Sequence, residues 1–398
     1  MDTAVRAPHF SGATGDGAEV RLHLAVAESR IAEVGIENRR PFGLLSVLIG
    51  RPAAEAPDLL RRLFPICGWA HAIACRHAIT AAEDARHAAT DAGDRDRLRA
   101  ELAVAHAWRS LIDWRTLLGL EPELAPLRRV VANAGHLRAA HASAPGAALN
   151  ALAEALEQAV FGSTPPPDAG AQTLIDWTRS TQSPAADLLA AVADSPLAIA
   201  AHPRTHLLSM SEADRLDAGL QTEPEAVVKG PDWFAARLAA DPDFGRQPTV
   251  DGMPTEVGAY ADCPAGDRQR FDQAGPVAAR LLAMLGAAAG LVAELRAAAS
   301  RHAEPCPASA ALTAPGTGGG VAATVRGPLA YWVRLEHGRI AALRSVAPTE
   351  WGLHPRGPLA RLLRGLPAAG AARTARLAAA AFDPCASIDI VLAEPADA

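Results

Sequence analysis

Apolar and polar side chains alternate near the start of the chain. Between residues 19 and 26, every second side chain is apolar, so these side chains share one face, as in a half-buried β-strand. The residues on this face are Val20, Leu22, Leu24 and Val26. Residues 31–36 follow after a short polar turn, so the pattern predicts a β-hairpin.

Helical spacing of apolar residues dominates the middle of the chain. Helices are predicted over residues 53–118, with breaks near Phe64–Pro65 and Gly93, and over residues 147–160, 184–201, 274–302 and 359–366. Residues 229–265 are rich in Pro, Gly and Asp, which predicts an irregular segment. A second hairpin is predicted over residues 321–346.

These elements predict an α+β fold that is mainly α-helical, in a single domain. Its expected parts are an N-terminal hairpin region (1–50), a helical body (51–302), a linker ending in Gly318, Gly319 and Gly320 (303–320), and a C-terminal hairpin with an Asp-Pro-Cys segment (321–398). The small antiparallel hairpins are expected near both ends of the chain.

Composition excludes several classes of partner. The 398 residues carry a net charge of −6 and no basic stripe, which argues against nucleic acid. The longest apolar stretch, residues 281–293, is too short to span a bilayer, and residues 1–17 lack the apolar core of a signal peptide. The chain is therefore expected to be cytoplasmic, without a membrane partner. Five dispersed cysteines do not form a disulfide framework and are expected to be thiols.

One stripe of soft side chains follows the predicted helix break at Phe64–Pro65. Cys67, His71 and Cys75 stand at positions i, i+4 and i+8 of the next helix, so they share one face. Free backbone N–H groups at a helix start stabilise a thiolate there. Such a face could present ligands to a metal, but a packed helix face with buried cysteines gives the same pattern.

A second candidate thiol, Cys385, follows Asp383-Pro384 near the C-terminus. Asp-Pro predicts a tight turn that directs the thiol inward, although a buried cysteine at the start of a terminal strand fits equally. Asp389 lies four residues further on. Cys263 and Cys306 stand in Pro-rich loops, where structural or incidental roles are expected.

These residues resemble motifs of the large subunit of nickel–iron hydrogenases. That family has an early RxCGxCxxxH motif and a late DPCxxCxxH motif, whose four thiolates hold a nickel–iron centre. Pro65-Ile66-Cys67-Gly68 resembles the first motif, and Asp383-Pro384-Cys385 resembles the second. Between them, Arg326-Gly327, His337-Gly338-Arg339-Ile340, Pro348-Thr349-Glu350-Trp351 and His354-Pro355-Arg356 follow the family's order of landmarks. Residues 247–258 resemble its APR–DG–EVGPLAR segment, so the resemblance implies a shortened large-subunit fold.

The departures from the family decide what the resemblance implies. Ala70 and Ile388 stand where the family has the two bridging cysteines, and Ala74 and Val391 replace the histidines. Thr249 stands at the arginine of the APR motif. Two of four thiolates are absent, so the resemblance implies no hydrogenase catalysis and no catalytic residues, and nickel is not expected.

This pattern is similar to the hydrogenase accessory proteins of the HupK/HoxV group. That resemblance implies a non-catalytic maturation protein, a scaffold for the Fe(CN)2CO fragment held by Cys67 and Cys385, with His71, Cys75 and Asp389 as further ligands or pocket wall. The implied partners are a hydrogenase maturation chaperone and an immature large subunit. A metal-free chaperone or interaction paralogue is the alternative, and a redox enzyme using Cys75 or His71 as replacement ligands is a third reading.

Overall fold

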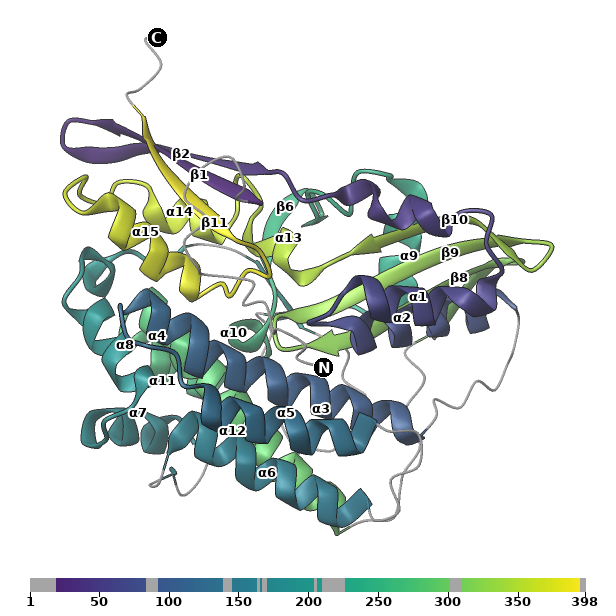
Figure 1. The fold of residues 1–398 in the computed structure, drawn as a ribbon. Helices are drawn as coiled ribbons and strands as arrows, with labels where there is room; N and C mark the ends of the chain where they lie inside the picture. The colour runs from purple at the N-terminus through teal and green to yellow at the C-terminus, as the bar shows by residue number, and fades with distance from the viewer. Residues whose placement is uncertain are drawn as a thin grey trace.

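A bundle of long helices forms one layer of the molecule (Figure 1). The structure, a computed structural model, describes residues 19–83, 92–138, 145–162, 165–166, 170–203, 206–209, 226–300 and 310–393. The bundle consists of α3 (Ala92–Trp108), α5 (Leu124–Arg138), α6 (Pro145–Phe161) and α12 (Pro276–Ala299), with α4 (Trp114–Leu117), α7 (Ala171–Ser180), α8 (Pro184–Ala193), η4 (Pro196–Ile199) and α11 (Ala265–Asp272) at one end. Its core consists mainly of Ala and Leu side chains, and the small alanines allow the helices to approach closely.

Helix α12 is the central helix of this bundle. By length and composition it is apolar enough to cross a membrane, but 72% of its most apolar window is buried inside the structure. The apolar stretch at 281–293 is therefore part of a longer, 24-residue helix. Its apolar side chains pack against α3, α6, α7 and α8 rather than forming an exposed band.

The two ends of the chain meet in one three-stranded sheet. Its order is β11 (Ile388–Ala393), β1 (Val20–Ala27) and β2 (Arg30–Asn38), with β1 antiparallel to β2 as predicted. The sequence did not predict that β11 would pair with β1 in parallel, from Val20 opposite Ile388 onward. The alternating face is buried at Val20, Leu22 and Leu24, whereas Val26 follows a register shift and stays partly exposed.

A second sheet packs between two helices. Its order is β10 (Arg339–Val346), β9 (Gly327–Glu336), β8 (Thr317–Thr324) and β7 (Ala310–Ala314), with α2 (Gly68–Ala82) on one face and α9 (Pro231–Ala240) on the other. The predicted linker over residues 303–320 is therefore wrong from residue 310 onward. Residues 303–309 lie outside the described part of the chain. The predicted hairpin at 321–346 is confirmed as β8, β9 and β10.

The glycine run in β8 explains how closely the helices approach. A Cβ on Gly318 or Gly320 would lie 2.3 Å from a backbone oxygen of α2, and one on Gly319 would lie 2.3 Å from the Cβ of Ala235 in α9. Real Cβ atoms do not approach so closely. These glycines therefore set the distance between the sheet and the helix that begins at Cys67.

The remaining elements are short and connect the two layers. A third sheet has the order β4 (Ala226–Val228), β3 (His206–Ser209), β6 (Met253–Glu256) and β5 (Thr249–Val250). The connecting helices are η1 (Phe42–Leu48), η2 (Ala53–Glu55), α1 (Ala56–Leu63), η3 (Arg109–Asp113), α10 (Ala259–Asp262), α13 (Pro348–Gly352), α14 (Pro358–Leu363) and α15 (Ala371–Ala380). The expected irregular segment over 229–265 is thus wrong where α9, β5, β6 and α10 occur. Helices α5, α7 and α15 were not predicted from the sequence.

Three hairpins turn on two residues with positive φ. These pairs are Glu28–Ser29 in the β1–β2 hairpin, Asp251–Gly252 between β5 and β6, and His337–Gly338 between β9 and β10. Two consecutive residues with positive φ match the right-handed twist of paired strands. The break between α1 and α2 falls at Phe64–Pro65, as predicted.

We expect the replacement Gly320→Ala to lower the free energy of unfolding by about 1–3 kcal/mol, because the added methyl group overpacks the contact between β8 and α2. Gly290→Ala in α12 is the matched control, since a Cβ there meets nothing within 4 Å and alanine favours a helix. Urea unfolding of both variants measures the difference. An equal effect of the two replacements would contradict this account of the glycine run.

Candidate functional site

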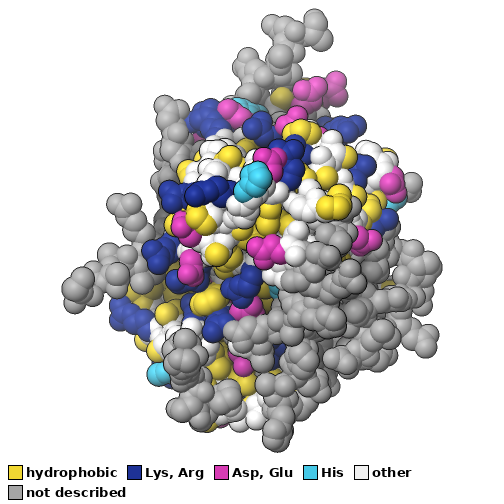
Figure 2. Space-filling view, turned by 90° about the vertical axis from the view of Figure 1, so that its right-hand side faces the viewer, with side chains coloured by type: hydrophobic (Ala, Val, Ile, Leu, Met, Phe, Trp, Pro, Cys, Tyr) yellow, Lys and Arg dark blue, Asp and Glu magenta, His cyan; other side chains and the backbone are white. Residues whose placement is uncertain are grey.

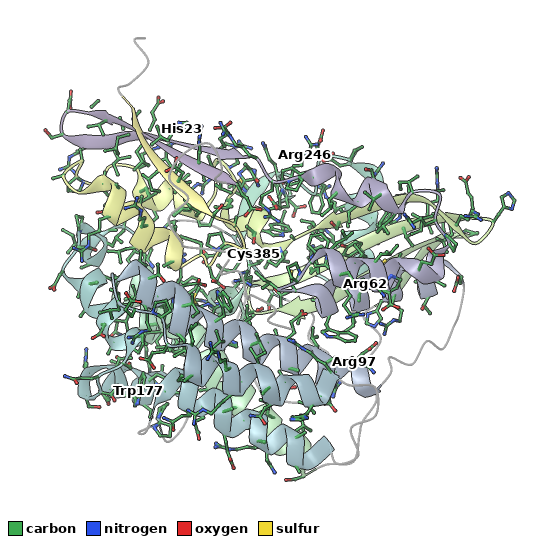
Figure 3. The ribbon with its side chains drawn as sticks, in the orientation of Figure 1. His23, Arg62, Arg97, Trp177, Arg246 and Cys385 are labelled. Carbon is green, nitrogen blue, oxygen red and sulfur yellow. The ribbon has the colours of Figure 1, made fainter. Side chains whose placement is uncertain are left out.

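The structure brings the two predicted thiols together. Cys67 is the residue before the first turn of α2, and Cys385 lies in the bend between α15 and β11. Their side chains are hydrogen-bonded to each other although 318 positions separate them in the chain (385 − 67). Figure 3 shows Cys385 near the middle of the molecule, where the helical layer meets the sheets. The expectation that the C-terminal segment packs against the start of the Cys67 helix is confirmed.

Local packing fixes the position of Cys67. Pro65 and Ile66 form a tight turn after α1, and a Cβ on Gly68 would lie 2.5 Å from the backbone oxygen of Arg61. Only glycine fits there without moving the turn. Cys67 therefore stands at a fixed place at the N-terminal end of α2, where backbone N–H groups are free of intrahelical partners.

Two sets of hydrogen bonds position Cys385. Its backbone N–H donates to Oγ1 of Thr349 in α13, at 3.1 Å. Two residues later, Ser387 and Glu19 exchange hydrogen bonds: Glu19 N donates to Ser387 Oγ at 3.0 Å, and Ser387 N donates to Glu19 Oε2 at 3.2 Å. The strand pairing of β11 with β1 begins at the next residue. The thiol thus sits directly before a segment that is fixed to the N-terminal strand.

The pKa values of the two thiols shift in opposite directions. The hydrogen bond from Cys67 to the sulfur of Cys385, together with the guanidinium of Arg326, lowers the pKa of Cys385, although burial acts the other way. The same hydrogen bond, reinforced by burial, raises the pKa of Cys67. The favoured state of the pair is therefore a Cys385 thiolate that accepts a hydrogen bond from the Cys67 thiol.

Arg326 and Asp383 form the charged wall of the site. Arg326 Nε donates to the backbone oxygen of Asp383 at 2.7 Å and lies 3.2 Å from its Oδ2, and Arg109 also donates to that carboxylate. Burial alone would raise the pKa of Asp383, but the two guanidinium groups hold it below its usual value. Burial would lower the pKa of Arg326, yet Asp383 and the two thiols raise it.

Arg326 was not predicted as a site residue. The resemblance placed Thr249, which begins the short strand β5, at the arginine of the family's APR motif. The charge of Arg326 nonetheless acts on both thiols. The available signal was Arg326-Gly327 at the start of β9, which was noted only as a landmark in the order of motifs.

Glu101 of α3 is a second residue of the candidate site that the sequence did not reveal. Its carboxylate accepts hydrogen bonds from the backbone N–H groups of Trp69, at 2.7 Å, and Ala70, at 3.0 Å. It therefore satisfies the first N–H groups of α2 from a different helix. Burial raises its pKa to about 7 despite these bonds, and its charge in turn raises the pKa of Cys67.

A third buried carboxyl group, Glu350, borders Cys385 from the sheet side. Asn38 Nδ2 donates to its Oε2 at 2.7 Å, and Arg40 Nη1 lies 2.6 Å from its Oε1. Burial raises the pKa of Glu350 to about 7, and the charges of Arg40 and Glu350 both act on Cys385. This network ties the end of β2 to α13 beside the thiol.

The three further residues predicted as ligands or pocket wall make contacts of their own. His71 lies 2.6 Å from the hydroxyl of Tyr331 and stacks on Phe64, and burial lowers its pKa to about 3, so it is neutral. Cys75 is fully buried in an apolar cluster, which raises its pKa to about 12. Asp389 pairs with Arg21 across β11 and β1, at 3.7 Å.

Ligand sets larger than the thiol pair do not occur in the described part of the chain, where no group of three or more His, Cys, Asp or Glu side chains is placed to hold a metal ion. Cys263 is partly exposed in a loop, and burial raises its pKa to about 12. Cys306 lies outside the described residues. The chemistry available is therefore that of two neighbouring soft sulfur ligands beside a guanidinium.

A π-helical turn, η3 (Arg109–Asp113), contacts the charged wall through Arg109. All five of its residues are buried, and it supplies Arg109 to Asp383. Burial and the charge of Asp383 raise the pKa of Asp113 to about 7, and burial lowers that of His106 to about 3. Single π-turns within helices occur frequently at functional sites.

A narrow cleft reaches the charged wall from the side of α10 and α12. It holds about 20 Å³, room for roughly one water molecule. Arg280 donates to both carboxylate oxygens of Glu256, at 2.7 and 2.6 Å, and lies over the rings of Tyr260 and Phe382. Arg326 and Asp383 are among the residues that line it.

The buried state of Glu101 predicts a pH dependence of stability. Its folded-state pKa, about 7, exceeds the ordinary value of 4.5, so the folded chain binds more protons between these two pH values. Its contribution to the free energy of unfolding therefore falls as pH rises from 4.5 to about 7, by about 3 kcal/mol in total. Glu101→Gln cannot titrate and should lack this fall.

Urea unfolding at pH 5 and pH 8 tests this difference in slope. Glu55→Gln serves as the control, because the Glu55 side chain is half exposed beside Arg51. Parallel pH dependences of wild type and Glu101→Gln would contradict the assignment of a buried, protonatable carboxyl group at the start of α2.

Known proteins share both this sequence pattern and this fold. No protein-family model matches the chain. Solved structures of similar fold include nickel–iron–selenium hydrogenases from D. vulgaris Hildenborough, with a TM-score of 0.51 over 91% of this chain and 95% of that one, and from Dm. baculatum, with a TM-score of 0.53 over 90% and 94%. Both are 14% identical in sequence, so the likeness is one of fold, that of the nickel–iron hydrogenase large subunit.

Curated relatives match almost the whole chain. The hydrogenase expression/formation protein HupK of Rhizobium leguminosarum bv. viciae is 30% identical over 389 residues, 95% of this chain and 98% of the relative. The hydrogenase expression/formation protein HoxV of Cupriavidus necator is 30% identical over 383 residues, 90% of this chain and 93% of the relative. The resemblance stated from the motifs is thus confirmed, and the chain belongs to the HupK/HoxV family of hydrogenase expression/formation proteins.

Proposed function

We propose that this protein acts in hydrogenase maturation as a scaffold that holds the Fe(CN)2CO fragment on Cys67 and Cys385 until it is passed on. The observation that carries the proposal is the contact between these two thiols, which come from opposite ends of the chain. Family membership supports the maturation role, and the paired sulfurs supply a reason for keeping a large-subunit fold.

The chemistry of the site suits an iron fragment that arrives with its own ligands. Iron that already binds two cyanides and one carbon monoxide needs few protein ligands, and cysteine thiolates are soft ligands suited to it. Iron(II) with two cyanides and two thiolates carries a net charge of −2. The guanidinium of Arg326, which acts on both sulfurs, offsets part of this charge and can donate N–H groups toward a cyanide nitrogen.

The positions of the absent thiolates favour release and exclude nickel. Ala70 is fully buried, and its N–H donates to Glu101. Ile388 is the first residue of β11, opposite Val20. Neither side chain supplies a bridging sulfur, so the second metal of a binuclear centre lacks ligands here. A fragment held by two protein sulfurs, with no second metal beside it, has few bonds to the protein to break on transfer.

The rival function is a metal-free chaperone or interaction paralogue of the large subunit. The fold supports it, because a protein shaped like a large subunit presents similar surfaces to shared partners. The proposed partners in either case are a maturation chaperone that carries iron and an immature hydrogenase large subunit, in the cytoplasm. Basic and acidic side chains lie mixed over the described part of the face in Figure 2, which does not favour nucleic acid on that side.

Infrared spectroscopy distinguishes the two functions. Protein purified without oxygen from cells that also express the maturation machinery should show the stretching bands of bound carbon monoxide and cyanide. Cys67→Ser and Cys385→Ser should each reduce the bound iron by at least roughly tenfold, because even the loss of an outer-shell partner costs a metal site 10–100-fold. Cys263→Ser, at a partly exposed thiol in a loop, should retain the bands. Full bands in both site variants would sink the scaffold role.

The protein should also lack hydrogenase activity. Uptake of hydrogen with an artificial electron acceptor is expected to be undetectable, because Ala70 and Ile388 leave the site without bridging thiolates. Nickel should be substoichiometric in the same samples. Robust turnover with one nickel per chain would refute the proposed function outright.

A further inference from the structure

We propose that Cys67 and Cys385 form a reversible disulfide, so that oxidation of this pair closes the site to iron. The bond itself follows from the contact between the two thiols alone. Its consequence for iron rests on the proposed function. Intracellular disulfides of this kind are typically transient and sense the redox state.

Geometry favours this pair over the other described cysteines. Cys67 and Cys385 are hydrogen-bonded to each other, and neither residue is fully buried. Cys75 is fully buried in an apolar cluster against β8 and β9. Cys263 packs against the helical core and is not among the groups that act on either site thiol.

Both cysteines lie outside the regular elements of the fold. Cys67 lies between a turn and the first residue of α2, and Cys385 lies in a bend rather than inside a helix or strand. Neither cysteine lies inside a helix or a strand. The bond would therefore form without breaking a helix or a ladder of strand hydrogen bonds.

A low-molecular-weight disulfide, such as glutathione disulfide, is the chemical class of oxidant. The sulfur of Cys385 attacks one sulfur of the oxidant, its S–S bond breaks, and one thiolate leaves. The sulfur of Cys67 then loses its proton and attacks the mixed disulfide, which releases the second thiolate. In total, the protein loses two hydrogen atoms and the oxidant gains them as two small thiols. Arg326, beside both sulfurs, stabilises the thiolate form that each step needs.

Oxidation would remove both proposed iron ligands at once and join the two ends of the chain. The bond would close a loop of 318 positions (385 − 67), and disulfides across long loops restrict the unfolded chain most strongly in the entropic account. The oxidised protein should therefore melt at a higher temperature than the reduced protein. Reductant should reverse both the bond and the shift.

The first experiment maps disulfides in the full chain. Purified protein is equilibrated with mixtures of reduced and oxidised glutathione, free thiols are blocked with a maleimide, and peptides are identified by mass. A peptide that joins Cys67 to Cys385, removed by reductant, is the expected result, with Cys75 unpaired. Cys67→Ser should give only a glutathione adduct on Cys385. The same adduct persisting in the wild type, without the joined peptide, would overturn the inference.

The second experiment separates this inference from the proposed function. Reduced and oxidised protein are each exposed to the iron-carrying maturation chaperone, and carbon monoxide and cyanide bands on this chain are compared. Iron entering the reduced form but not the oxidised form supports both ideas. A joined peptide without iron uptake in either form keeps the disulfide and refutes the scaffold. Iron uptake by a protein that never forms the joined peptide supports the scaffold and refutes the disulfide.

Discussion

The parallel pairing of β11 with β1 is the constraint on which the site depends. It fixes the C-terminal segment to the N-terminal strand, with Ser387 and Glu19 exchanging hydrogen bonds at its start. Cys385 precedes that contact by two residues, so its freedom to move away from Cys67 is small. Because the pair comes from residues 318 positions apart (385 − 67), the site exists only when the whole chain has folded.

Patterning revealed the elements that carry regular local signals. The alternation at Val20, Leu22 and Leu24 predicted β1, and Pro65 predicted the break before α2. It failed where tertiary contacts override local signals. The glycines at 318–320 indicated a linker because glycine is usually found in loops, but here they allow a strand to pack between α2 and α9. Likewise, no local sequence pattern predicts that β11 pairs in parallel with β1.

The candidate site shows the same difference between residues with local sequence signals and residues placed by tertiary contacts. Cys67 and Cys385 were found because their motifs are local, whereas His71 and Cys75 were included because they share a helix face with Cys67. In the structure that face turns into the core, where His71 meets Tyr331. Arg326 and Glu101 were missed because their roles arise from distant pairing: a guanidinium beside two thiols, and a carboxylate at the start of another helix. Contacts between charged groups from distant parts of the chain can be recognised only from the three-dimensional structure.

The charges around the two thiols also explain why the pair holds one proton. Asp383 is bound by two guanidinium groups, from Arg109 and Arg326, so this cluster carries one excess positive charge that one thiolate balances. A second thiolate would add an unbalanced negative charge, and the pair therefore retains one proton on Cys67. In the proposed scaffold, bound iron would remove this restriction, because its positive charge would replace that proton. The two thiols alone thus favour the half-protonated pair. Under the proposed function, binding of an iron fragment would favour both thiolates, so that binding and the release of one proton would be coupled.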